Sequence, residues 1–170
     1  EALTENVPLR TYLHRAIQHG LPTYAECGGL MYLCQTLVDF DGTLWPMVGA
    51  LPAIATMTRR LSLGYRQATA QRSTPLLTPG QTLWGHEFHR STLDSAPPTP
   101  LYQYQPYPTA ADVPEPRPPP EGWGHDTLQA SYLHLHWGDR PDLAQRFLQT
   151  CQQHQRDRLA DSQEAINYTG

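Results

Sequence analysis

Lysine is absent from this 170-residue chain, whose twelve basic residues are all arginines. A phosphate-binding P-loop needs a lysine, and Schiff-base catalysis needs an amine nucleophile. Neither chemistry can therefore reside in these residues. We expect any ATP use linked to this chain to take place on a different segment of protein.

Long apolar runs and a disulfide framework are also missing. No stretch has the length of a signal peptide or a membrane span. The three cysteines, Cys27, Cys34 and Cys151, form an odd set without framework spacing. These features favour a reducing cytoplasm and no membrane partner.

The charge balance excludes a further class of partner. The formal net charge is −4 and the sequence pI is about 6.0. Such a chain has no electrostatic attraction for phosphate backbones, so we expect no nucleic-acid partner.

Proline is abundant and unevenly distributed. Ten of the 17 prolines fall within residues 97–120, and such a stretch cannot donate enough backbone hydrogen bonds for a central strand. We predict one domain over residues 1–154 with an exposed, extended insertion at 97–120. A polar tail over 155–170 is expected to fray.

The periodicity of apolar residues predicts an α/β protein. Helices are expected over 8–19, over 28–38 and from Pro141 onward, and strands over 21–25, within 47–70, over 82–91 and over 128–137. The inner face of the last helix is expected to carry Leu143, Ala144, Phe147, Leu148 and Cys151.

The stretch PTYAECGGLMYL, residues 22–33, combines an apolar strand, a glycine-rich turn and a helix. Cys27 stands at the turn, where a nucleophile is exposed above a sheet and faces the positive end of the following helix. That position predicts a lowered thiol pKa. Gly28 directly follows, so its backbone N–H is a candidate oxyanion donor.

Each cysteine also has a purely structural interpretation. Cys27 could be a small buried hydrophobic residue beside a turn, although the strand–turn–helix pattern favours a nucleophile. We interpret Cys34 and Cys151 as core residues.

A cysteine nucleophile needs an imidazole to accept its proton and return it to a leaving amine. His134 and His136 project from the same face of one predicted strand, and His86 and His89 lie on a second predicted strand. Together these four could instead bind zinc. However, alternation along a strand sends the side chains of His86 and His89 to opposite faces, which disfavours one shared metal. A structural role for these two residues stays open.

Four segments, YAECGGLMYL, LGYR, GHEFHRS and ASYLHLHW, occur in this order along the chain. With them the chain resembles the C-terminal glutaminase domains of cobyrinic acid a,c-diamide synthases, in the cobyrinate and cobyric acid synthase branch of the class I glutamine amidotransferases. The resemblance covers roughly residues 1 to 150.

This resemblance implies a flavodoxin-like three-layer α/β sandwich, incomplete at its N-terminus. Cys27 would attack the side-chain amide of glutamine to form a thioester and release ammonia, and His134 would be the general acid/base. The implied partners are glutamine, an ATP-binding synthetase domain upstream or in trans, the corrin substrate through that domain and, as a candidate, a second copy of the chain. ATP and magnesium would bind the synthetase domain, with no cofactor in this chain.

The chain departs from the wider class I pattern at three points. His136 stands where the third triad member is usually Glu, so what orients His134 is open. Met31 replaces a common glutamine, and the glycine-rich loop that supplies the other oxyanion donor is expected upstream of Glu1.

Several roles therefore stay open. Glu26 orients nearby backbone, contacts a partner domain, or is a solvated turn residue. Tyr65 and Tyr132 are expected in the core or in a pocket wall, and the GHEFHRS segment near the glutamine pocket. A second hypothesis for the whole chain is a catalytically silent binding module.

Overall fold

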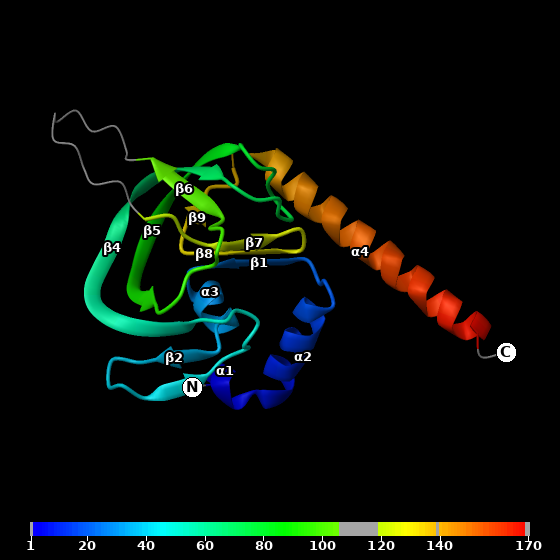
Figure 1. Cartoon of the computed structure of the whole chain (residues 1–170), viewed down its shortest axis with the longest axis horizontal. Helices are drawn as coiled ribbons and strands as arrows, with labels where there is room; N and C mark the ends of the chain where they lie inside the picture. The colour runs from blue at the N-terminus through cyan, green and yellow to red at the C-terminus, as the bar shows by residue number, and fades with distance from the viewer. Residues whose placement is uncertain (1, 106–118, 139, 169–170) are drawn as a thin grey trace.

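Helices and strands alternate along the first half of the chain, and strands dominate the second half until a long final helix (Figure 1). This computed structural model describes residues 2–105, 119–138 and 140–168, with side chains up to residue 163. The helices are α1 (Ala2–Glu5), α2 (Val7–Gln18), α3 (Gly28–Leu33) and α4 (Pro141–Tyr168). The strands are β1 (Thr23–Glu26), β2 (Thr36–Val38), β3 (Leu44–Pro46), β4 (Ile54–Ala70), β5 (Thr82–Leu93), β6 (Tyr102–Gln105), β7 (Trp123–His125), β8 (Leu128–Ser131) and β9 (His134–Leu135).

The strands of the described residues form two mixed sheets. One has the order β1-β8-β7, with β1 parallel to β8. The other has the order β3-β2-β4-β5-β9, and β6 pairs with β4. Within this second sheet β2 and β4 run parallel, and the other pairs are antiparallel. The expected α/β class is confirmed, whereas these sheets do not clearly form a flavodoxin-like sandwich.

The predicted first helix and first strand match α2 and β1 closely. The side chain of Asn6 accepts a hydrogen bond from the Leu9 N–H at 3.1 Å and so caps α2. Gly20, just beyond the helix, has a φ of +83°, which suits glycine. The chain can therefore reverse and enter β1.

The helix predicted over 28–38 is wrong in its second half. α3 ends at Leu33, and residues Thr36–Val38 form β2. β2 pairs with Ile54–Thr56 of β4 and with β3. The pairing with β4 joins segments that are not neighbours in the chain, and local periodicity does not register such a contact.

The single strand predicted over 128–137 is also wrong. β8 ends at Ser131 and pairs with β1, whereas β9 begins at His134 and pairs with β5 in the other sheet. A short turn over residues 131–134 therefore connects the two sheets. It places His134 beside β5.

The long curved strands β4 and β5 form an antiparallel pair that supports much of the larger sheet (Figure 1). Side chains of β5 alternate as period-two geometry requires: Leu83, Gly85 and Glu87 are buried, whereas His86 and Phe88 are exposed. The opposite-face prediction for this histidine strand is thus confirmed. Tyr65 of β4 is also exposed, which excludes the core and leaves the pocket wall of the two positions expected for it.

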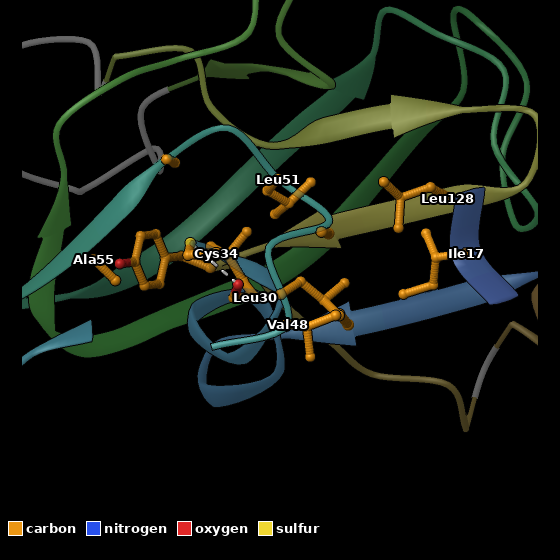
Figure 2. Packing of buried hydrophobic residues seen from close by; sticks show 12 residues of the cluster. Ile17, Leu30, Cys34, Val48, Leu51, Ala55 and Leu128 are labelled. Carbon is orange, nitrogen blue, oxygen red and sulfur yellow. Dashed lines mark hydrogen bonds between the residues drawn. The ribbon is translucent and has the colours of Figure 1, made fainter. Parts of the chain in front are cut away.

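Two hydrophobic clusters form the core. The first surrounds α3 and contains residues from distant segments, seven of which are labelled in Figure 2: Ile17, Leu30, Cys34, Val48, Leu51, Ala55 and Leu128. Cys34 is fully buried, which confirms its packing role. Tyr132 also belongs to this cluster, as expected.

The second cluster lies under β6 and the first turn of α4. It contains Leu101, Tyr102 and Tyr104, all fully buried, together with Leu143. The prediction that residues 97–120 are exposed throughout is therefore wrong for 101–105, because these residues pair with β4 and fill a hydrophobic space. Residues 106–118 lie outside the described part of the chain.

The final helix differs from the predicted frayed tail. α4 extends to Tyr168 and projects away from the sheets (Figure 1). Leu148, expected on its inner face, is 60 % exposed, whereas Cys151 is half-buried. Cys151 and His154, further along the helix, are half-buried, so Leu148 meets solvent because it lies on the outer face of α4. No described helix is long and apolar enough to cross a membrane.

Candidate active site

Cys27 occupies a strained turn between β1 and α3, as the sequence predicted. Its φ of +48° makes it the one non-glycine residue with positive φ among the described residues. Such a conformation costs roughly 1–3 kcal/mol and is typical of functional turns. Its N–H donates to the Ser131 carbonyl at 2.9 Å, and its carbonyl accepts from the Met31 N–H at 3.1 Å. These two bonds hold the turn in place.

The space beside this turn is open on the Gly28 side. A side chain built at Gly28 would meet no other heavy atom within 4 Å. The turn is therefore uncrowded on the Gly28 side, next to the backbone N–H that the sequence predicts as an oxyanion donor.

The sulfur of Cys27 is half-buried, and its thiol lies 3.8 Å from the Phe88 carbonyl oxygen. Burial raises the pKa of the Cys27 thiol, and the negative charge of Glu26 raises it further, while the N–H of Gly28 opposes both effects. The lowered thiol pKa predicted from the sequence is therefore wrong. α3 is a helix of six residues, and its N-terminus does not outweigh desolvation.

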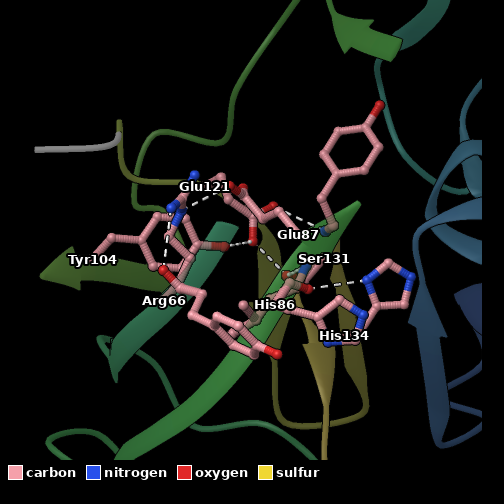
Figure 3. Close-up of polar contacts among 10 residues, drawn as sticks. Arg66, His86, Glu87, Tyr104, Glu121, Ser131 and His134 are labelled. Atoms are coloured by element: carbon pink, nitrogen blue, oxygen red, sulfur yellow. Dashed lines mark hydrogen bonds and ion pairs between the residues drawn. The ribbon is translucent and has the colours of Figure 1, made fainter. Parts of the chain in front are cut away.

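His134 is oriented by the backbone of β5. Its Nδ1 lies 3.0 Å from the carbonyl oxygen of His86 (Figure 3). Because a carbonyl can only accept, Nδ1 carries the proton, and the neutral ring leaves Nε2 as a free base. The His86 ring stacks on the His134 ring, with centroids 4.8 Å apart and 13° between planes. The sequence has His136 where related enzymes have a glutamate that orients the histidine. In this chain the backbone carbonyl of His86 orients His134 instead.

One edge of β5 connects the candidate nucleophile, Cys27, with the imidazole of His134. The carbonyls of His86 and Phe88 are two residues apart on the strand, so they point to the same side about 7 Å from each other. His134 contacts the first carbonyl and Cys27 the second. The two predicted groups therefore meet the same strand edge, although they are 107 residues apart in the sequence.

Glu26 forms a second connection between these groups. Its Oε1 accepts the backbone N–H of Leu135 at 2.8 Å and also accepts the hydroxyl of Tyr24. Glu26 precedes the nucleophile, and Leu135 follows the imidazole. The interpretation that Glu26 orients nearby backbone is thus confirmed, and that of a solvated turn residue is wrong.

The remaining two predicted histidines, His89 and His136, make neither of the two contacts with the β5 edge that Cys27 and His134 make. His89 stacks on Tyr132 at 3.8 Å between centroids, and its Nδ1 lies 2.9 Å from the Ser91 carbonyl oxygen. Burial lowers the pKa of His89. His136 is exposed beyond the end of β9 and lines a small groove with Trp84 and Arg140. Within residues 2–105, 119–138 and 140–168, no group of three or more metal-binding side chains occurs.

Sequence reasoning missed three residues that shape the site. Ser131 holds the Cys27 turn, as described above. Gly85 has no room for a side chain, because a Cβ there would lie 2.5 Å from the backbone oxygen of His134. Glu121, which follows three prolines, contacts the 131–134 turn. The glycine within GHEFHRS was the one available signal, since a glycine inside a strand often marks close approach of another backbone.

Comparison with known families is consistent with this geometry. Residues 1–142 match the model of the CobB/CobQ-like glutamine amidotransferase domain. The chain belongs to this family. The match includes the Cys27 turn, β5 and His134, and it ends where α4 begins.

Individual members of the CobB/CobQ-like family are clearly similar. The chain is 51 % identical over 151 residues to the cobyrinate a,c-diamide synthase of Synechococcus sp., covering 89 % of this chain and 32 % of that protein. It is 44 % identical over 151 residues to the Synechocystis sp. enzyme of the same name, covering 89 % and 30 %. It is 46 % identical over 149 residues to hydrogenobyrinate a,c-diamide synthase of Thermobifida fusca, covering 85 % and 29 %. The chain thus spans about a third of the length of these relatives.

Proposed function

We propose that this chain is the glutaminase domain of a cobyrinate a,c-diamide synthase, which hydrolyses glutamine to supply ammonia for amidation of corrin carboxylates in cobalamin biosynthesis. The observation that carries the proposal is the common β5 edge that Cys27 and His134 contact. Family membership and similarity to named synthases support the reaction and the substrate class. The three cysteines are free, which supports a cytoplasmic location.

The first half of the proposed reaction forms a thioester. Nε2 of His134 takes the proton from the Cys27 sulfur, and the thiolate attacks the side-chain amide carbon of glutamine. The carbonyl oxygen becomes an oxyanion beside the Gly28 N–H. As the carbon–nitrogen bond breaks, the His134 imidazolium donates its proton to the leaving nitrogen, and ammonia departs.

The second half releases glutamate. Water attacks the thioester carbon while Nε2 of His134 accepts its proton. The carbon–sulfur bond breaks, and the proton passes to the departing sulfur, restoring the Cys27 thiol. The raised pKa of the Cys27 thiol fits this order of steps, because the resting sulfur is neutral and needs the imidazole to ionise it.

The ATP and magnesium implied by the synthase reaction have no matching group here. The chain has no lysine for a P-loop, and its described part contains no cluster of three side chains suited to a metal. We assign ATP-dependent activation of the corrin carboxylates to the remaining two thirds of the longer synthase. The parallel pair β1 and β8, with Cys27 at the carboxyl end of β1, supports a flavodoxin-like sandwich in that longer protein.

The outer face of β4 and β5 is the surface that we propose the synthetase region contacts. Leu63, Tyr65, Trp84 and Phe88 expose 47–67 % of their areas there, and the paired residues of the two strands share this face. It adjoins the site, because His86 of this face stacks on His134. In the full-length synthase, Leu63→Arg should reduce glutamine-driven amidation and spare amidation from free ammonia. Equal loss of both would contradict this docking surface.

A direct test uses a glutamine analogue with an electrophilic carbon in place of the amide. It should label Cys27 and leave Cys34 and Cys151 unmodified, as read by peptide mass spectrometry. Cys27→Ala should abolish glutamate release yet spare amidation driven by free ammonia in the full-length synthase. A chain that releases no glutamate at high glutamine, alone and within the synthase, would instead be a silent binding module.

A further inference from the structure

Glu121 joins two strands, β6 and β8, behind the candidate site. Its backbone bridges to Tyr102 of β6, with N–H to carbonyl distances of 2.9 and 3.2 Å. Its Oε1 accepts the Tyr104 hydroxyl at 2.7 Å and also the Ser131 hydroxyl. Its Oε2 accepts the Tyr132 N–H at 3.2 Å (Figure 3). The carboxylate therefore connects β6 with the end of β8.

Ser131 links this carboxylate to both reactive groups. Its carbonyl oxygen accepts the Cys27 N–H at 2.9 Å. Its hydroxyl oxygen accepts the Leu133 N–H at 2.9 Å, which closes the turn immediately before His134. A shift of the 131–134 turn would thus move the strained Cys27 turn through one bond and His134 through the chain itself.

We propose that Glu121 is a positioning residue that holds the 131–134 turn so that Cys27 and His134 act on the same substrate. This inference rests on the glutaminase function proposed above. Glu121 touches neither Cys27 nor the His134 ring among its hydrogen bonds, so its effect is transmitted through Ser131 and Tyr132. A misplacement of about 1 Å in such an arrangement can reduce rate about 100-fold.

The charge state of Glu121 matters for this role. Two of its partners are hydroxyls and the third is the Tyr132 backbone N–H, and the ionised carboxylate accepts from all three at once. Burial raises the pKa of Glu121 to about 7, and the nearby Glu87 raises it too, while the three hydrogen bonds oppose this change. Once protonated, the acid carries a hydrogen that must itself be donated, and the hydroxyl oxygen of Ser131 or Tyr104 can accept it. Protonation therefore reverses one hydrogen bond of the cluster and rearranges the contacts that hold the 131–134 turn.

The groups that face Glu121 do not supply a free positive charge. Tyr102 and Tyr104 come from β6, and both have a raised pKa because they are buried beside acidic groups. Glu87 comes from β5, and its partner on β4, Arg66, binds it at 2.8 Å. Tyr132, beyond β8, likewise has a pKa raised by burial. We therefore expect Glu121 to be the group of this cluster that titrates near neutral pH.

The main test compares Glu121→Gln with wild type in glutamine hydrolysis, with kcat and KM measured from pH 5.5 to pH 9. The amide cannot accept at both positions, so kcat should fall about 10- to 100-fold with KM nearly unchanged. The acid limb of the kcat profile should also lose one ionisation. Far-UV circular dichroism checks that the variant is folded.

Tyr104→Phe is the matched control, because it removes a bond to the same carboxylate from the side away from the turn. Its kcat at pH 8.5 should stay within about twofold of wild type. Its acid limb should move to higher pH, because the lost hydrogen bond stabilised the ionised form. If Glu121→Gln fails to fold, Ser131→Ala replaces it, and an unchanged kcat in that variant overturns the proposal.

A second readout separates this inference from the function on which it rests. Alkylation of Cys27 by iodoacetamide requires no glutamine. The rate of this alkylation should change at least threefold in Glu121→Gln and should stay the same in Tyr104→Phe. If wild type releases no glutamate but this difference appears, the glutaminase proposal fails and the positioning role stands. A folded Glu121→Gln chain with wild-type alkylation, kcat and pH profile overturns the positioning role.

Discussion

Glu121 should make the stability of the fold depend on pH. Its pKa rises from an ordinary 4.5 to about 7 in the folded chain. At roughly 1.4 kcal/mol per pH unit, this interval corresponds to about 3 kcal/mol. Because the folded state binds the proton more tightly, this stabilisation is complete below pH 4.5 and is lost as pH rises through 7. Glu121→Gln removes the titration.

Other groups titrate in the same window with the opposite sign. The pKa values of His89 and His125 are lowered by burial, so their contribution to stability is lost as pH falls below about 6.5. The difference between wild type and Glu121→Gln cancels these terms. Only this difference isolates the carboxyl group.

Urea unfolding followed by tryptophan fluorescence measures the free energy of both proteins at pH 5 and pH 8, since the chain has four tryptophans. The stability of wild type relative to Glu121→Gln should decrease by about 2.5 kcal/mol between these pH values. Glu87→Gln, in the neighbouring carboxylate, serves as a comparison for general loss of charge. A relative stability that changes by less than about 1 kcal/mol would refute a raised Glu121 pKa.

Three further predictions concern the site and the core. Gly85→Ala should displace β9, because its Cβ would lie 2.5 Å from the backbone oxygen of His134. Glutaminase activity should then drop at least about tenfold. Full activity would contradict the close approach of the two backbones. Glu26→Gln keeps its acceptor oxygen but removes the charge that raises the Cys27 pKa, so the midpoint of Cys27 alkylation against pH should move lower, and an unmoved midpoint would exclude this effect. Leu30→Ala, in the fully buried core, should cost about 2–5 kcal/mol in urea unfolding, and a loss below 1 kcal/mol would show that the core relaxes around the cavity.

Local signals in the sequence predicted the nucleophile turn well. Residues 23–33 contain an apolar strand, a cysteine, two glycines and an apolar helix, and they form this arrangement in the structure. Alternation along residues 82–91 likewise predicted that His86 and His89 point to opposite faces of this strand. These features depend on residues close together in the chain, so periodicity and turn chemistry suffice to find them.

Contacts between distant segments decided the rest of the site. Thr36–Val38 became a strand because β3 and β4 offer partners, and the strand predicted over 128–137 divided because β1 and β5 lie in different sheets. The same holds for the raised pKa of Cys27, which burial controls.

The sequence by itself therefore placed Cys27 at a strand–turn–helix junction in an α/β protein, and the resemblance of its motifs singled out His134 for the proposed chemistry. The tertiary structure decided how they are held. A backbone carbonyl at His86 orients the imidazole, and a carboxylate from the end of a proline-rich segment, Glu121, holds the intervening turn. Neither contact leaves a sequence signal, because a backbone carbonyl is common to every residue and hydrogen bonds between remote segments exist only once the chain has folded.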